Sequence, residues 1–253
     1  MRAFLIGLQF LTRISISRQE VWTEEDFGRS VRYFPLVGAV LGMIYATAAY
    51  GLFQFPHRFG VYIPYEFASA ILLAMPVLLT GAIHCDGFMD TVDGIFSGRS
   101  RERMLEIMKD SRTGSFGVVA FVLLMLIQWS ALMDIGYQEL PVAVFVMPII
   151  GRLMMMSTAI TLFPYARPDG MGKAFAQYAS RKVLALMWLY SLAILAVFGK
   201  IALISLAAAL LFMLMFARHV TAVLGGLTGD VYGAICTMCE LVVLITFLLG
   251  HIL

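Results

Sequence analysis

Long apolar runs alternate with short polar segments along this chain, and the pattern predicts membrane-spanning helices. Most runs are near the length of about 20 residues that a helix needs to cross the hydrocarbon core of a bilayer. Only Gly199 and Lys200 separate the fifth and sixth runs, which therefore form either a tight hairpin or one bent element. The predicted spans lie at about 34–53, 66–84, 116–133, 140–163, 183–198, 201–217 and 231–253.

The N-terminal region is shorter and more polar than these runs. Residues 3–14 are apolar but are interrupted by Arg13, which favours an interfacial helix over a span. Thr23 precedes three acidic residues, a pattern typical of a helix N-cap, and this second short helix extends toward Tyr33. The sequence therefore predicts an all-α, polytopic transmembrane helix bundle. It has about seven spans plus N-terminal interfacial helices, in a single membrane domain over residues 1–253.

The composition supports a membrane protein rather than a soluble one. Hydrophobic residues make up 61% of the chain and charged residues only 13%, whereas a soluble domain has about 25% charged residues. The net charge is +2, and the basic residues are scattered rather than gathered in one patch. A lipid bilayer is therefore the expected partner, and nucleic acid is not.

The distribution of Lys and Arg predicts the orientation. With the N-terminus in the cytoplasm, all but three of the eighteen Lys and Arg residues fall in cytoplasmic segments. Arg58 and Lys200 fall outside, and Arg152 lies within a predicted span. Cytoplasmic loops of membrane proteins carry such an excess of Lys and Arg. The polar segments between spans are therefore expected to face the cytoplasm.

The most polar segment is residues 84–117, which hold six of the sixteen acidic and five of the eighteen basic residues. Asp86, Asp90 and Asp93 are spaced so that a helix places their carboxylates within roughly 60° of arc. Like charges at this spacing repel each other, and a bound cation would relieve the repulsion. Oxygen ligands favour Mg²⁺ or Mn²⁺, so these three acids are candidate metal ligands. The alternative is a solvated acidic helix face.

Residues 99–114 contain a second series of acids interleaved with bases. An amphipathic helix with surface ion pairs has this pattern, and that interpretation stays open for Glu102 and Arg103. The segment that follows combines two cations, an acid and hydroxyl groups, which suits phosphate binding beside a metal. We therefore interpret residues 85–115 as a cytoplasmic-side catalytic segment. Its candidate residues here are Lys109, Asp110, Ser111 and Arg112.

A few charged residues stand inside or beside apolar runs. Arg152 and Glu240 lie within predicted spans, where an unpaired charge is costly, so we expect them to form a pair. The alternative is that Arg152 contacts a substrate phosphate. Asp230, at the start of the last span, is a second candidate for function. The loop 164–173 is rich in glycine, proline and charge and is expected to close over a ligand.

Together these residues indicate metal-assisted transfer chemistry on a phosphate-bearing substrate at the membrane face. Such chemistry needs positioning and charge neutralisation, which divalent ions held by carboxylates supply. The competing class is a transporter or channel that uses the acids as an ion path. The acids gather at one face rather than along the middle of the spans, which favours the enzyme.

The same segments resemble those of the cobalamin-5′-phosphate synthase (adenosylcobinamide-GDP ribazoletransferase) family. The resemblance rests on residues 81–94 (GAIHCDGFMDTVDG) and 105–117 (LEIMKDSRTGSFG). Shorter matches follow the family's order over nearly the whole chain, with Cys85 standing where a leucine is expected. These matches are FLTR at 10–13, YFPLVG at 33–38, GR at 151–152, YAR at 165–167 and GLTGD at 226–230.

The resemblance implies a late step in cobalamin biosynthesis. A member of this family joins adenosylcobinamide-GDP to α-ribazole or its 5′-phosphate and releases GMP, with Mg²⁺ as cofactor. It lies in the prokaryotic cytoplasmic (inner) membrane, and its state as a homo-oligomer or partner of other cobalamin-assembly enzymes is open. The acid pattern also resembles CDP-alcohol phosphotransferases, the second candidate class. The implied catalytic residues are Asp86, Asp90, Asp93 and Asp110, and the implied substrate-binding residues are His84, Lys109, Ser111, Arg112, Arg152, Arg167 and Asp230.

Overall fold

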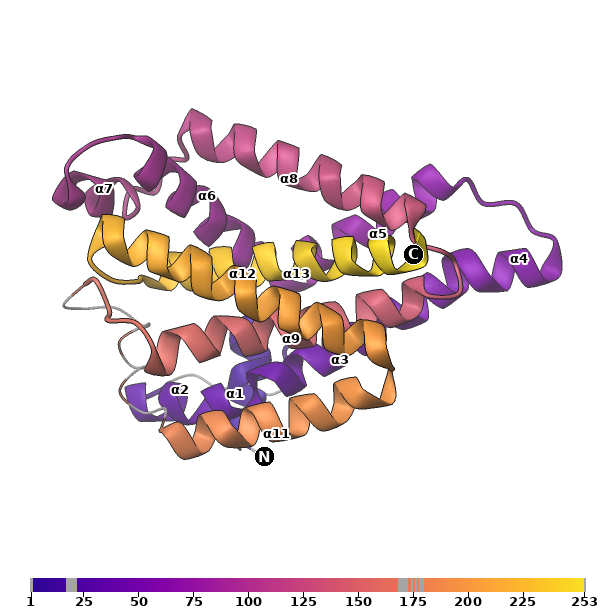
Figure 1. Cartoon of the computed structure of the whole chain (residues 1–253), viewed down its shortest axis with the longest axis horizontal. Helices are drawn as coiled ribbons and strands as arrows, with labels where there is room; N and C mark the ends of the chain where they lie inside the picture. The colour runs from indigo at the N-terminus through magenta and orange to yellow at the C-terminus, as the bar shows by residue number, and fades with distance from the viewer. Residues whose placement is uncertain are drawn as a thin grey trace.

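The computed structural model describes residues 2–16, 22–167, 173, 175, 177 and 180–252. Within these ranges the chain is almost entirely helical, and the long helices lie alongside one another in an elongated bundle (Figure 1). The predicted all-α architecture is confirmed. The described part of the loop 164–173 ends at residue 167 and resumes only at residue 173, so half of that predicted turn lies outside the described residues.

Two short helices, α1 (Arg2–Leu11) and α2 (Glu24–Ser30), lie at one end of the bundle. The start of α2 is a capping box, in which two side chains satisfy two backbone amides reciprocally. Thr23 Oγ1 accepts a hydrogen bond from the Asp26 backbone N at 3.1 Å, and Asp26 Oδ2 accepts one from the Thr23 backbone N at 3.4 Å. This confirms the predicted helix start at Thr23.

From α2 the chain stays helical through several consecutive segments. Gln54 fixes their outer end, because its side-chain Nε2 donates hydrogen bonds to the backbone carbonyls of Tyr137 at 3.0 Å and Gln138 at 3.2 Å. The last of these segments projects beyond the rest of the bundle (Figure 1). The segments are η1 (Val31–Tyr33), α3 (Phe34–Ala49), the π-helical η2 (Tyr50–Gln54) and α4 (Phe55–Phe59).

A sharp bend separates α5 (Tyr65–Thr80) from α6 (Ile83–Phe96), whose axes meet at 90°. Gly81 and Ala82 both adopt left-handed backbone conformations, with φ of 64° and 62°. Glycine tolerates this region, whereas alanine adopts it rarely. Arg13 holds the bend from outside, because its backbone N donates to the Leu79 carbonyl at 2.7 Å and its guanidinium covers Gly81. The bend gives α6 a direction of its own.

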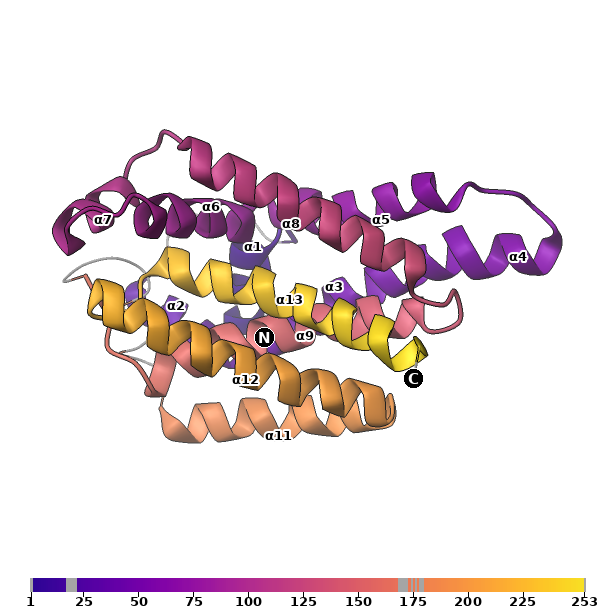
Figure 2. The same ribbon diagram turned by 45° about the horizontal axis from the view of Figure 1, so that its top comes forward.

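The centre of the bundle is α9, which packs against α3 and α13. Gly38 and Gly42 of α3 lie directly on the backbone of α9, where a Cβ atom would collide with main-chain carbonyls. Small residues at such contacts let two helices approach closely. Figure 2 shows α8 on the outside of this core, with α6 beside it. The remaining helices are α7 (Arg101–Ile107), α8 (Ser115–Asp134), α9 (Leu140–Thr161), α11 (Arg181–Val197), α12 (Lys200–Leu224) and α13 (Gly229–Ile252).

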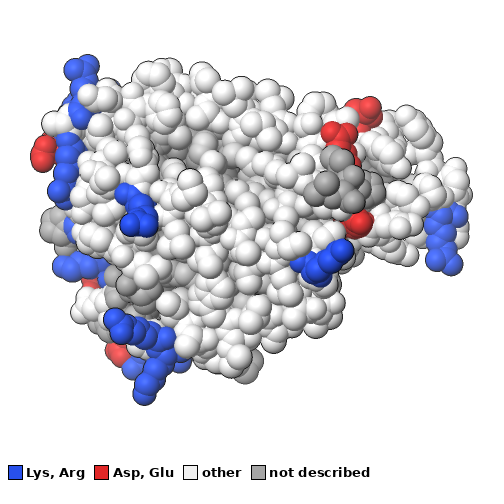
Figure 3. Space-filling model, in the orientation of Figure 1, with Lys and Arg blue, Asp and Glu red and all other residues white. Residues whose placement is uncertain are grey.

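Five helical segments of the described chain are long and apolar enough to span a membrane, and the bent pair α5–α6 makes a sixth if it counts as one span. The sequence predicted about seven, because it counted residues 183–198, where α11 has 17 residues. The exact number of spans stays a prediction. Figure 3 shows charged side chains gathered toward the two ends, with an almost uncharged belt between them. Such a belt is what a bilayer-embedded bundle requires.

Candidate functional site

The three aspartates of α6 have different environments. Asp86 is exposed, Asp90 is half-buried, and Asp93 is buried with 7% of its surface accessible. Asp86 and Asp93 both lie near enough to Asp90 to interact with it electrostatically. The helical spacing therefore places Asp86 and Asp93 near Asp90, while the role of the three acids as metal ligands stays a prediction. Along α6, the exposure of the carboxylates therefore decreases from Asp86 near the bend to Asp93 near α8.

Asp93 is fully engaged by the start of α8. Its Oδ2 accepts a hydrogen bond from the Gly114 backbone N at 2.7 Å, and its Oδ1 accepts one from the Gly117 backbone N at 2.8 Å. A carboxylate at this position satisfies free amides of the first turn and complements the helix dipole. A Cβ atom on either glycine would collide with the carboxylate, so both positions require glycine. Asp93 thus ties α6 to α8.

Asp230 joins the acids of α6 from the first turn of α13. The two helices touch closely here, since a Cβ atom on Gly87 would come within 2.7 Å of the Asp230 carbonyl oxygen. Arg167 Nη1 forms an ion pair with Asp230 Oδ2 at 3.0 Å, and Thr228 Oγ1 donates to the same oxygen at 3.2 Å. Asp90 is near enough to interact electrostatically with both Asp230 and Arg167. Asp230, which the sequence predicted as a functional residue, therefore adds a fourth carboxylate to the three of α6.

A short backbone pairing holds Arg167 in this position. The Ala166 backbone N donates to the Leu227 carbonyl at 2.8 Å, and the Leu227 backbone N donates to the Pro164 carbonyl at 2.8 Å. These two bonds join the segment after α9 to the turn before α13. Arg167 also reaches toward α7, where its Nη2 lies 3.5 Å from the Leu105 carbonyl. Two segments that the sequence analysis named separately thus form one unit.

Among the described residues, Arg167 forms an ion pair with one of the four carboxylates of this cluster, which leaves an excess of negative charge. We define the acidic cluster as Asp86, Asp90, Asp93 and Asp230. Among the described residues, no three His, Cys, Asp or Glu side chains approach closely enough to form a complete metal site. The donor set nevertheless fits a hard cation, because Mg²⁺ is commonly held by one or two carboxylates with water and substrate phosphates. The exposed Asp86 and half-buried Asp90 are the members most open to such an ion.

A cavity of about 220 Å³ adjoins the acidic cluster. It lies between α6 and α13 on one side and α1, α3 and α9 on the other. Asp86 and Asp230 belong to its lining, and so do His84 and Tyr232, which are 6% and 2% exposed. The sequence predicted His84 as a binding residue but gave Tyr232 no role. A hydroxyl two residues after Asp230 on the same helix was the available signal.

The candidate residues of the α7 region lie outside this cavity. Arg103 and Glu106 form a surface ion pair at 2.7 Å, which supports the interpretation of an amphipathic, ion-paired helix. Asp110 pairs with Arg112 through both of its oxygens, at 3.1 and 2.8 Å. These hydrogen bonds lower the pKa of Asp110 from 3.8 to about 2. Asp110 is therefore an ionised surface carboxylate, and Ser111 is exposed beside it, as is Lys109.

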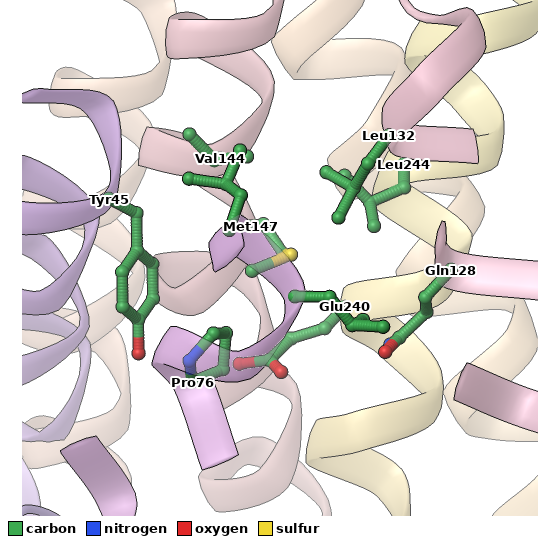
Figure 4. Close-up of a pocket in the computed structure, with 10 residues that line it drawn as sticks. Tyr45, Pro76, Gln128, Leu132, Val144, Met147, Glu240 and Leu244 are labelled. Carbon is green, nitrogen blue, oxygen red and sulfur yellow. The ribbon is translucent and has the colours of Figure 1, made fainter. Parts of the chain in front are cut away.

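Arg152 and Glu240 form the buried ion pair that the sequence analysis expected. Their side chains are 1% and 9% exposed. Figure 4 shows Glu240, Tyr45 and Gln128 directing polar ends toward a small cavity of about 30 Å³ whose other walls are mostly apolar. This volume holds about one water molecule. The substrate-binding role of Arg152 stays a prediction, because its guanidinium lies inside the bundle with a partner of its own.

The fold and the site define a multi-pass membrane protein with an acidic cluster and an adjoining cavity between its helices. Comparison with known proteins assigns the chain to a family. The chain belongs to the cobalamin-5-phosphate synthase family, whose model matches residues 3–248. The family resemblance of the sequence motifs is thereby confirmed.

Relatives from several bacteria share the whole length of the chain. A protein of Desulfitobacterium hafniense named adenosylcobinamide-GDP ribazoletransferase is 39% identical, over 99% of this chain and 96% of its own. Proteins of the same name from Pseudomonas aeruginosa and Clostridium acetobutylicum are 36% and 34% identical, over 98% and 97% of this chain and 98% and 95% of their own. No solved structure matches this chain.

Proposed function

We propose that this protein is an adenosylcobinamide-GDP ribazoletransferase, which joins adenosylcobinamide-GDP to α-ribazole or its 5′-phosphate and releases GMP. The family and the names of its relatives support this activity. The structural observation that supports the proposed activity is the acidic cluster together with Arg167. With a bound cation, these groups can neutralise charge during transfer of a phosphate-bearing group. Family membership favours this reaction over lipid-headgroup transfer and over cation transport.

The reaction breaks one phosphorus–oxygen bond and forms another. A hydroxyl oxygen of the acceptor bonds to the phosphorus on the cobinamide side of the pyrophosphate, and the bond from that phosphorus to the bridging oxygen breaks. GMP leaves with that oxygen, and the hydroxyl proton passes to a carboxylate. The accepting carboxylate belongs to the acidic cluster, in which Asp230 is already engaged by Arg167 and Thr228.

We further propose that the reaction depends on Mg²⁺. Asp86 and Asp90 would hold the ion together with substrate phosphates, and the ion would neutralise charge on the pyrophosphate and on the departing GMP. Arg167 adds a positive charge at the same place. Asp93 contributes by positioning, because both of its oxygens already accept hydrogen bonds from α8. The three metal ligands predicted from the sequence are thus proposed to divide into two binding residues and one positioning residue.

We place the site on the cytoplasmic side of a prokaryotic inner membrane. The distribution of Lys and Arg supports this orientation, because α7 and the loops around it contain many of them. Substrates that carry phosphates would then reach the acidic cluster directly from the cytoplasm. A homo-oligomeric state and an association with other cobalamin-assembly enzymes stay predictions.

The proposal is tested by GMP release from adenosylcobinamide-GDP by the purified protein in detergent. Release is expected with α-ribazole present, is expected to stop after chelation, and should return when Mg²⁺ is restored. Asp134→Asn is the matched control, because Asp134 is an exposed carboxylate at the far end of α8. GMP release that does not require the acceptor would identify a hydrolase instead, and no release at all would refute the activity.

A further inference from the structure

Three phenylalanines form one wall of the cavity beside the acidic cluster. The ring centroids of Phe10 and Phe34 lie 6.1 Å apart, and both rings contact Phe175 at centroid distances of 5.7 and 5.5 Å. Phe34 is fully buried and Phe175 is 5% exposed. The helices opposite contribute glycine backbone from Gly87 and Gly229. The cavity therefore lies between aromatic side chains and a wall that combines glycine backbone with polar side chains, an arrangement that suits a flat ligand with a polar atom.

Two buried polar atoms at this cavity have no hydrogen-bond partner among the described residues. They are His84 Nε2 and the Tyr232 hydroxyl. Both side chains are more than nine-tenths buried and line the cavity. Buried polar groups in native proteins are nearly always hydrogen-bonded, so these two groups are available to a molecule that binds in the cavity. That molecule needs at least one hydrogen-bonding atom on an otherwise apolar body.

The size of the cavity restricts the ligand further. Its volume of about 220 Å³ equals about seven water molecules at about 30 Å³ each. Sites that enclose a whole drug-sized ligand have roughly 300–1,000 Å³. The cavity therefore has room for one ring system, and the remainder of a larger substrate would extend past Asp86 and Asp230 toward the acidic cluster.

We propose that this cavity binds the base of the acceptor nucleoside, a flat, methylated benzimidazole, with His84 Nε2 donating a hydrogen bond to the free ring nitrogen. This inference rests on the proposed transferase activity and adds a specificity site to it. Phe10, Phe34 and Phe175 supply the apolar surface for the ring. Because Asp86 and Asp230 line the same cavity, the sugar hydroxyl attached to the base is brought to the acidic cluster.

The guanine of the donor substrate is the competing occupant. Guanine has donors and acceptors along most of its edge, and enclosing it against three phenylalanines would leave several of them unpaired. The benzimidazole ring has one free nitrogen and an otherwise apolar edge, so one of the two unpartnered groups, His84 Nε2, satisfies it while the ring lies against the phenylalanines. The balance of polar and apolar groups therefore favours the acceptor base.

The first test compares two acceptors that differ at one atom. An indole riboside has carbon where the benzimidazole riboside has its free nitrogen, so only the proposed hydrogen bond is lost. The wild-type protein is expected to prefer the benzimidazole acceptor by about five- to tenfold in kcat/KM, the usual effect of one neutral hydrogen bond. His84→Phe should lose the preference, and His84→Gln, whose amide can donate, should regain part of it. Equal use of both acceptors by the wild-type protein would overturn the assignment of His84.

The second test separates the two substrates. Phe175→Leu should raise the KM for the acceptor by about three- to tenfold, because an aromatic contact is lost, and should leave the KM for adenosylcobinamide-GDP unchanged. Phe145→Leu is the matched control: Phe145 is similarly buried, at 8% exposed, and it contacts Phe198 rather than the cavity. A change in the donor KM alone would place guanine in the cavity and overturn the proposal.

Equilibrium binding distinguishes this inference from the proposed function. Binding of the free benzimidazole riboside is measured by calorimetry on the full-length protein in detergent, without donor or Mg²⁺. Weaker binding to Phe175→Leu than to Phe145→Leu would support the cavity even if no GMP were released, in which case only the transferase activity would fail. Normal GMP release together with equal acceptor binding by both variants would refute the cavity and leave the activity standing.

Discussion

Replacing Glu240 by glutamine leaves the Arg152 guanidinium inside the bundle without its counter-charge. The Arg152 side chain is 1% exposed, and its Nε has no hydrogen-bond partner among the described residues, so the substitution leaves a buried charge poorly compensated. Breaking a buried ion pair by removing one partner costs about 3–5 kcal/mol. For a chain of this length, each kcal/mol lowers Tm by roughly 2–4 °C, so a fall on the order of 10 °C is expected.

A double-mutant cycle gives the sharper form of this prediction. Arg152→Met removes the other charge with similar length, and the double variant should be more stable than the sum of the two single losses by about 2 kcal/mol or more. The hydroxyl of Tyr45 and the amide of Gln128 lie near enough to the cavity beside residue 240 to accommodate the glutamine (Figure 4). Thermal unfolding in detergent measures all four corners of the cycle.

The exposed pair Arg103–Glu106 is the matched control for this cycle. Both side chains are 63% exposed, so its coupling should be no more than about 0.5 kcal/mol. Additive losses at Arg152 and Glu240 would refute the pairing argument. An Arg152→Met variant that keeps its stability but loses GMP release would instead indicate that Arg152 contacts substrate phosphate.

Three further predictions concern the site and its surroundings. Asp86→Asn and Asp90→Asn should each lower the rate by about 10²–10³-fold, because each removes one of the carboxylate charges proposed to hold Mg²⁺ in the transition state. Near-normal turnover of both variants at low Mg²⁺ would contradict the proposed metal site. Because the folded-state pKa of Asp110 is lowered to about 2, its stabilising pair forms as the pH rises above that value and is lost only as the pH falls through it. Asp110→Asn should therefore leave the shape of the pH–rate profile between about pH 5 and 9 unchanged. A cysteine introduced by Ser97→Cys should react with an impermeant thiol reagent only from the cytoplasmic side, and one introduced by Gln138→Cys only from outside; the reverse pattern would invert the proposed orientation.

The features that were predictable from the sequence are those that depend on local pattern or on the high cost of buried charge. The apolar runs predicted the helices, and the acids after Thr23 predicted the start of α2. The pairing of Arg152 with Glu240 was predictable because few charges lie within the spans, so each had few candidate partners. The proximity of Asp86 and Asp90 was also predictable, because it follows from their spacing along one helix and depends on no tertiary contact.

The features that were not predictable arise from contacts between distant segments. Residues 66–84 were predicted as one span, and the apolar pattern did not indicate that Ala82 adopts a left-handed conformation at a 90° bend. The hydrogen bonds from α8 to Asp93 cross more than twenty residues of sequence. The aromatic wall of the cavity assembles Phe10 and Phe175 from opposite halves of the chain, where each residue by itself matches ordinary core packing.

The attachment of Asp93 to α8 makes the thickness of the bilayer relevant to the site. Of the five continuous candidate spans, α8 is the least enclosed by protein, with 28% of its apolar window buried, so its tilt depends most on the surrounding lipid. A bilayer thinner or thicker than its apolar length would change that tilt. Because two hydrogen bonds fix the start of α8 to Asp93, the movement is transmitted to α6 and its carboxylates. The lipid around this protein would then influence the geometry of its acidic cluster without touching a substrate.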